Sequence, residues 1–228
     1  MLKKLRNVSL KIFTNILLAD EINRATPRTQ SALLEAMEEE VVTIDGEGHT
    51  LEAPFLVIAT ENPIETTGTF PLPEAQLDRF MIKLTMADLT KSDEVSMLER
   101  FINDAPQNEV KPVCTKDDMV QAADAIKSVK VNRPVMEYIV SLSDSTRNAA
   151  KLFSGVSPRA SLNLMRISQS FATISGRDYV TPDDVRFLAP YVFAHRVITS
   201  AGITGLSDAR GIIKEIIQTI AVPVEDWK

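Results

Sequence analysis

The sequence predicts an α/β domain followed by an all-α domain. Short apolar runs at residues 16–19 and 55–59 read as buried strands, and each is followed directly by polar residues. Between them, apolar residues at helical spacing over 32–37 predict a helix, so strand and helix alternate as in a parallel sheet. From about residue 90 onward, strand patterns stop and helix-capping sequences recur. We place the boundary near residues 87–91.

The composition is that of an ordinary soluble protein and excludes several classes. With 228 residues, of which 44% are hydrophobic, the chain can bury a sizeable core. A net charge of −6 argues against a nucleic-acid-coating surface. The single cysteine, Cys114, excludes an intramolecular disulfide. Residues 1–13 are basic but lack a signal-peptide core, and no apolar run approaches the ~20 residues that span a bilayer, so we expect a cytoplasmic protein.

The first apolar run, Ile16–Ala19, is too short and too uniformly apolar for an amphipathic helix. We predict a strand covered on both faces, which ends at Asp20 and Glu21. Ligands of parallel sheets bind at the carboxyl ends of the strands. Asp20 can therefore hold Mg²⁺, and Glu21 can polarise a water molecule aimed at a phosphorus atom.

An Asp-Glu pair is weak evidence by itself, because chance gives roughly one such pair in a chain with this many acidic residues. Asp93-Glu94 is the chance pair, since it lies in the first turn of a predicted helix, where acidic residues suit the dipole.

The following elements have local signals. Thr26-Pro27 caps and begins a helix that closes in the solvated acidic run Glu38–Glu40. Alternation around Asp45-Gly46 predicts a β-hairpin over residues 41–53. The second strand, Phe55–Ala59, leads to Asn62, which either hydrogen-bonds a water or a γ-phosphate or merely starts a turn before a proline; spacing leaves both open.

A short helix at 73–80 carries Arg79. This side chain either pairs with Asp78 or Glu74 as an ordinary surface cation, or projects from the domain edge toward a phosphate held by a neighbouring subunit. Residues Met81–Thr85 then predict one more short strand.

The second part contains helices that begin at capping residues or at proline and end near glycine. Arg159 lies in the first turn of one of them, where a cation opposes the helix dipole; an external anion or a nearby carboxylate would compensate it. The helices are expected from Ser92 to about Asn103, Thr115 to about Val129, Pro134 to about Ala150, Pro158 to Gly176, after Thr181, and from Ser207 onward.

Taken together, four ordered stretches resemble the MoxR family of AAA+ ATPases over nearly the whole chain from about Phe13. ILLADEINRATP at 16–27 is similar to the Walker B strand and its following turn, and ATENP at 59–63 to the sensor 1 segment. GTFPLPEAQLDRF at 68–80 is similar to the stretch that ends in the arginine finger, and GVSPRA at 155–160 to sensor 2.

This resemblance implies roles for five residues. Asp20 would hold Mg²⁺, Glu21 would orient the hydrolytic water, and Asn62 would sense the γ-phosphate of ATP. Arg79 would reach the nucleotide of the adjacent subunit, and Arg159 would couple the lid to the bound phosphate.

The family also implies the architecture: a partial AAA+ core over residues 1–89 with the pre-sensor hairpin, and a helical lid over 90–228. It further implies a homohexameric ring that remodels or matures other proteins, often beside a partner with a von Willebrand factor A domain. The P-loop pattern GxxxxGK[ST] is absent, since none of the eight glycines is followed by lysine. The family places the P-loop strand between the strand at 55–59 and that at 81–85, so the expected sheet has a gap.

Two hypotheses follow. The chain is either part of a MoxR-type ATPase whose chemistry needs upstream residues, or a non-hydrolytic protein-interaction fragment of such an ATPase.

Overall fold

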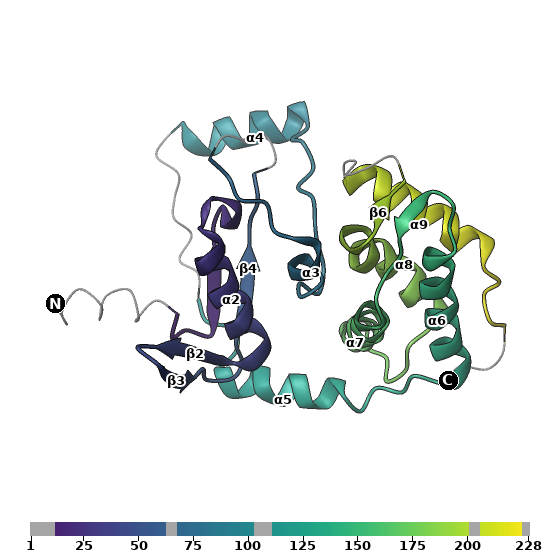
Figure 1. Ribbon diagram of the computed structural model, residues 1–228, viewed down its shortest axis with the longest axis horizontal. Helices are drawn as coiled ribbons and strands as arrows, with labels where there is room; N and C mark the ends of the chain where they lie inside the picture. Colours follow the sequence, from purple (N-terminus) through teal and green to yellow (C-terminus); the bar gives the residue numbers. More distant parts are fainter. Residues whose placement is uncertain (1–11, 63–67, 103–110, 201–205, 225–228) are drawn as a thin grey trace.

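The computed structural model describes residues 12–62, 68–102, 111–200 and 206–224, with the side chains of 206 and 207 excluded. Most of the basic N-terminal stretch considered above, residues 1–11, lies outside this range. Figure 1 shows the elements up to α3 on one side of the molecule and α6 to α9 on the other. The strands are β1 Ile16–Ala19, β2 Val41–Ile44, β3 Glu47–Thr50, β4 Leu56–Ala59, β5 Leu152–Ser154 and β6 Ile198–Thr199. The helices are α2 Pro27–Glu39, α3 Glu74–Leu77, α4 Lys91–Phe101, α5 Lys116–Ile126, α6 Arg133–Arg147, α7 Pro158–Ile174, α8 Pro182–Phe193 and α9 Leu206–Thr219, with 3₁₀ turns η1 Ile22–Arg24 and η2 Ala194–Arg196.

The two predicted apolar strands, β1 and β4, pair in parallel, and their register runs from Ile16 opposite Leu56 to Ala19 opposite Ala59. Parallel strands need a crossover connection, which α2 and the β2–β3 hairpin supply. Both strands therefore end at the same edge of the sheet. The residues that follow them are neighbours in space.

The prediction that the first strand is covered on both faces is wrong. Ile16 and Leu18 each keep 62% of their surface exposed, and Leu56 and Ile58 keep about half. Successive side chains of a strand point to opposite faces. One face of the sheet packs toward α2 through a small cluster around Leu34, whereas no described element covers the other face.

The predicted strand at Met81–Thr85 is also wrong. In this segment the Lys83 amide donates to the carbonyl of Tyr191 at 3.1 Å, and the Lys83 carbonyl accepts from Arg210 at 2.8 Å. The backbone thus binds α8 and α9 instead of a sheet. A strand forms only beside a partner strand, and no described strand lies next to this segment.

The hairpin is confirmed, and the helices begin within two residues of the predicted starts, although Thr90 and not Ser92 caps α4. Strands β2 and β3 pair antiparallel, and Asp45 and Gly46 both have positive φ, as a two-residue Asp-Gly turn requires. Capping boxes join Thr115 to Asp118 and Thr181 to Asp184. These signals are local, so a sequence displays them directly.

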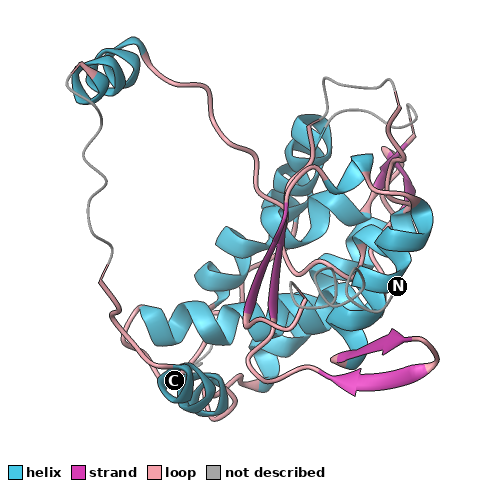
Figure 2. Cartoon of the chain, turned by 90° about the vertical axis from the view of Figure 1, so that its left-hand side faces the viewer, coloured by secondary structure: helices cyan, strands magenta, loops and turns pink. Residues whose placement is uncertain are grey.

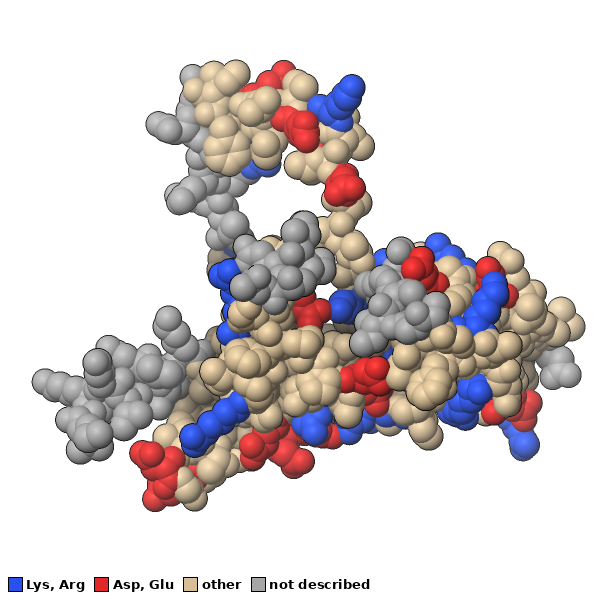
Figure 3. Space-filling view, turned by 45° about the horizontal axis from the view of Figure 1, so that its top comes forward, with Lys and Arg blue, Asp and Glu red and all other residues tan. Residues whose placement is uncertain are grey.

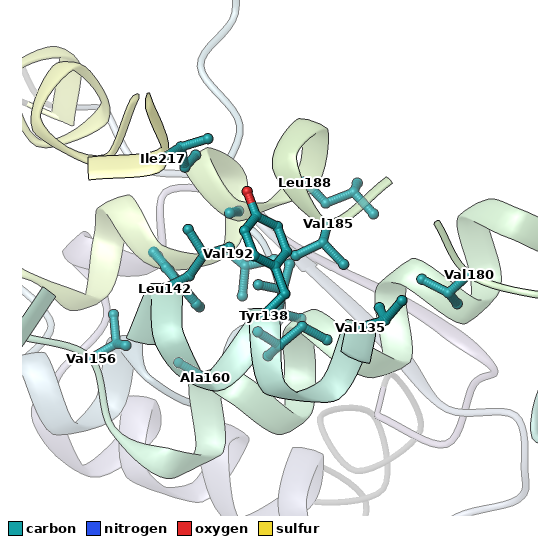
Figure 4. Packing of buried hydrophobic residues seen from close by; sticks show 14 of the residues in the cluster. Val135, Tyr138, Leu142, Val156, Ala160, Val180, Val185, Leu188, Val192 and Ile217 are labelled. Carbon is teal, nitrogen blue, oxygen red and sulfur yellow. The ribbon is translucent and has the colours of Figure 1, made fainter. Parts of the chain in front are cut away.

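The helical part has its own core, in which α6, α7, α8 and α9 pack together. Gly155 lies close to the backbone of Arg147, so α6 and the segment before α7 meet without an intervening side chain. Figure 4 shows the apolar side chains that converge between these helices. Residues of this cluster include Val135, Tyr138, Leu142, Val156, Ala160, Val180, Val185, Leu188, Val192 and Ile217.

Helices α4 and α5 contribute no buried residue. Figure 2 shows α4 standing away from the rest of the molecule. No helix among the described residues is long and apolar enough to cross a membrane.

Candidate functional site

The end of β1 forms a hydrogen-bonded unit with the end of β4. The hydroxyl of Thr60 donates to Asp20 Oδ1 at 2.6 Å and accepts from the amide of Glu21 at 2.8 Å. Thr60 therefore fixes both acidic positions at the strand edge. Our sequence reasoning missed this role, although Thr60 directly follows Ala59, and a parallel register would have placed it beside Asp20.

Glu21 has a left-handed backbone conformation, with φ 49° and ψ 54°. This conformation is uncommon for residues other than glycine and is typical of functional turns. Its carboxylate forms an ion pair with Arg24 at 3.3 Å, in which both side chains are partly exposed. Such an exposed pair is weak, so the carboxylate can exchange Arg24 for a water molecule at little cost.

Asp20 fits a magnesium site of the kind that phosphate substrates complete. Its side chain is exposed, and Thr60 is the only hydrogen-bond partner that the described residues supply, at Oδ1. Among the described residues, no group of three or more metal-ligating side chains gathers. Mg²⁺ commonly takes one or two carboxylates together with phosphate oxygens and water, so a single carboxylate here is sufficient.

Asn62 lies in the loop that follows β4, at the same edge of the sheet. Its backbone carbonyl accepts a hydrogen bond from Asn23 Nδ2 at 3.3 Å, which ties the loop to the turn after β1. The preceding residue, Glu61, forms a 2.6 Å ion pair with Lys83. The structure therefore brings Asp20, Glu21 and Asn62 together, as two parallel strands require.

The two candidate arginines meet elsewhere, on one carboxylate. Arg79 forms an ion pair with Glu38 at 2.8 Å and donates to the carbonyl of Leu34 at 3.2 Å. Arg159 donates to the other oxygen of Glu38. The hydrogen bond from Arg159, reinforced by the charges of both arginines, lowers the pKa of Glu38.

This arrangement corrects two expectations. Arg79 pairs neither with Asp78 nor with Glu74 in the described structure, and Glu38 does not belong to a merely solvated acidic run. For Arg159, the nearby carboxylate that we had considered as the ordinary alternative is present. We assigned no role to Glu38 from the sequence, because its partner Arg159 lies 121 positions away in the chain.

The acidic residues Asp20 and Glu21 lie beside the first turns of α2, whereas Arg79 and Arg159 bind near its C-terminal end. Gln30 Nε2 bonds the carbonyl of Ile22, next to the acidic site, at 3.1 Å. Glu38 lies eight residues further along the helix, which corresponds to about 12 Å at the usual rise. Within one chain the structure thus separates Arg79 and Arg159 from Asp20 and Glu21.

The residues that flank Arg79 are fastened to the helical part. Asp78 accepts from Arg196 Nε at 2.7 Å and from the hydroxyl of Ser157 at 2.9 Å. His195 Nε2 lies 3.1 Å from the carbonyl of Phe80. Burial, with a contribution from the charge of Arg196, lowers the pKa of His195 to about 4. The imidazole is therefore neutral near neutral pH.

The fold combines a short parallel sheet, which ends in adjacent acidic residues, with a helical lid, and this combination defines an AAA+ ATPase-like protein. Residues 3–82 match the family described as "ATPase family associated with various cellular activities (AAA)", and residues 144–222 match the AAA lid domain. At the level of the family the finding is more specific: the chain belongs to the MoxR family of AAA+ ATPases.

Three similar proteins illustrate this membership. The uncharacterized protein YeaC of Bacillus subtilis is 44% identical over 94% of this chain and 67% of its own length. The chaperone MoxR1 of Mycobacterium tuberculosis is 37% identical over 93% of this chain and 58% of its own length. A solved structure from Cytophaga hutchinsonii, described as a proposed ATPase, has a TM-score of 0.84 at 36% identity and covers 93% of this chain and 67% of the other. The chain therefore spans about two thirds or less of these proteins.

Proposed function

We propose that this chain supplies the magnesium- and water-positioning side of an ATP hydrolysis site, whose turnover drives remodelling or maturation of partner proteins. The observation that carries the proposal is the unit at the sheet edge, in which Thr60 ties Asp20 and Glu21 together. Family membership supports nucleotide binding, usually with Mg²⁺.

In this proposal each residue has a distinct task. Asp20 holds Mg²⁺, which neutralises charge on the phosphates when it is bound. Glu21 orients and polarises the attacking water, and Asn62 hydrogen-bonds the γ-phosphate. The left-handed backbone conformation of Glu21 and its weak ion pair with Arg24 support this assignment.

Arg79 acts on the nucleotide of a neighbouring subunit, and Arg159 couples the lid to the bound phosphate. The separation of Arg79 from Asp20 along α2 supports action between subunits, because Arg79 binds Glu38 and not the acidic site in the described structure. The matching assembly is a homohexameric ring, and a partner with a von Willebrand factor A domain belongs to the same proposal. The domains are a core over residues 1–89 and a lid over 90–228.

The 228 residues contain no P-loop, the loop whose backbone amides and lysine hold the phosphates of a nucleotide. We therefore propose that the isolated chain does not hydrolyse ATP. This absence also favours the second candidate, a non-hydrolytic protein-interaction fragment. A calorimetric titration of the isolated chain with Mg-ATP tests this account. Saturable micromolar binding would contradict our account of the missing loop.

The decisive test uses the chain restored with an N-terminal segment that carries the P-loop pattern GxxxxGK[ST]. Glu21→Gln should lower the turnover of this restored chain at least ~100-fold, because a positioned base contributes that much, while Mg-ATP binding is retained. The matched control is Glu94→Gln, in the other Asp-Glu pair, which should leave turnover unchanged. Unchanged turnover in Glu21→Gln would refute the assignment.

A further inference from the structure

A groove of about 480 Å³ lies between α8 and α9, and none of its lining residues is assigned to the candidate ATP site. Its charge is unbalanced. Arg186, Arg210 and Lys214 line it against one carboxylate, Asp183. The whole chain carries a net charge of −6, and Figure 3 shows acidic and basic side chains interspersed on the face that it draws. A local excess of cations in an acidic protein indicates an acidic ligand.

The groove also offers aromatic surface. Phe187 keeps 54% of its surface exposed, and its ring lies 5.8 Å from that of Tyr191. The guanidinium of Arg210 stacks over Tyr191, with 5.0 Å between them. Flat aromatic and guanidinium faces of this kind favour a ligand with its own large aromatic ring.

Two buried polar atoms near the groove have no hydrogen-bond partner among the described residues. One is the hydroxyl of Tyr138, whose residue is 3% exposed, and the other is Nε of Arg210. Figure 4 shows the Tyr138 hydroxyl pointing out of the apolar cluster toward Ile217, which lines the groove. Buried polar atoms are normally satisfied, so unsatisfied ones at a groove indicate a polar ligand.

The sequence that follows α9 has the complementary chemistry. Residues 224–228 read Val-Glu-Asp-Trp-Lys, with two carboxylates directly before the only tryptophan of the chain. We propose that the groove of one copy binds residues 224–228 of a second copy. Glu225 and Asp226 meet the groove cations, and the Trp227 ring lies on Phe187 and Tyr191.

The direction of the chain favours a second copy over the same one. Figure 1 shows the chain leaving α9 and running away from the α8–α9 pair. Val224 is 92% exposed, so the chain has left the surface of the lid at this point. The three residues from Val224 to Trp227 span at most about 11 Å. Return to the same groove would require the described path after α9 to reverse.

Such a contact is head-to-tail, because groove and segment are different surfaces. Repeated contacts of this type close into rings or continue as open chains. The proposal is independent of the nucleotide site, since it uses no residue assigned to ATP chemistry.

Fluorescence of Trp227 in the purified full chain tests the proposal directly, because no other tryptophan contributes. With increasing protein concentration the emission should shift to shorter wavelength, as the indole leaves water, and sedimentation should show association over the same range. Emission that does not change with concentration would overturn the proposal. This includes a constantly blue-shifted signal, which would mean that the segment occupies the groove of its own chain.

Charge reversal identifies the groove. Lys214→Glu should raise the midpoint concentration about tenfold, because it cancels the net positive charge of the groove that attracts Glu225 and Asp226. The matched control is Lys127→Glu, the same change at an exposed position after α5, which should leave the midpoint unchanged. Equal effects of Lys214→Glu and Lys127→Glu would assign the association to another surface.

Discussion

Arg196 joins the lid to the segment that carries Arg79, and we expect Arg196→Met to destabilise the protein by about 3 kcal/mol. The Arg196 side chain is 1% exposed, and its Nε lies 2.7 Å from Asp78 Oδ1. Removing one partner of a buried ion pair costs about 3–5 kcal/mol, because the other charge stays buried without compensation. The lower end applies here, since Asp78 is 23% exposed and keeps the hydrogen bond from Ser157.

Urea unfolding followed by far-ultraviolet circular dichroism measures this loss. The matched control is Arg133→Met, whose Nε also lies 2.7 Å from a carboxylate, that of Glu137, but at an exposed position. Equal geometry with different burial isolates the effect of burial, so the control should change stability far less. A loss in Arg196→Met no larger than that in Arg133→Met would refute the reasoning.

A double variant separates charge from packing. If the cost is that of an unpaired buried charge, Asp78→Leu added to Arg196→Met should recover much of the stability, because apolar pairs can replace buried ion pairs. If the cost is lost packing of the Arg196 stem, the second substitution should bring no recovery.

Two further predictions concern the lid and its junction with the core. With the pKa of His195 at about 4 in the fold and 6.5 as the reference, the unfolded chain binds more protons between these values. The free energy of unfolding should therefore fall by up to about 3 kcal/mol as the pH drops from about 6.5 to 4. Urea midpoints measured across this range should fall less steeply in His195→Gln than in the unchanged chain. Parallel pH profiles of the two proteins would contradict this. A methyl group at Gly155 would lie 2.5 Å from the Arg147 amide nitrogen, whereas one at Gly211 meets nothing within 4 Å. Thermal unfolding should show Gly155→Ala destabilised by about 1–3 kcal/mol and Gly211→Ala, within α9, stabilised by about 0.5–1 kcal/mol; similar shifts in both would count against the close contact at Gly155.

The elements that were predicted correctly depend on neighbours in the sequence. Asp45-Gly46 specifies its hairpin turn because these two residues tolerate positive φ. Thr181 and Asp184 specify a helix start because each bonds the backbone of the other. The place of Asp20 and Glu21 at the end of a strand was predicted for the same reason, since an apolar run that stops at two acids is visible without any tertiary contact.

Elements that depend on distant partners were not predictable in this way. The pattern at Met81–Thr85 is apolar enough for a strand, but strand formation needs a neighbouring strand, and the Lys83 backbone instead binds α8 and α9. The exposed face of β1 has the same origin, because coverage of a sheet depends on what packs against it.

The sequence by itself therefore determined the hairpin, most of the helix starts, the family and the place of the acidic residues at the end of the first strand. Only the tertiary structure showed that Arg79 and Arg159 meet on Glu38, and that Arg196 holds Asp78 across 118 positions. Local signals act through bonds between near neighbours. Pairing of distant charges is decided by how the lid packs on the core, and no short sequence pattern encodes that packing.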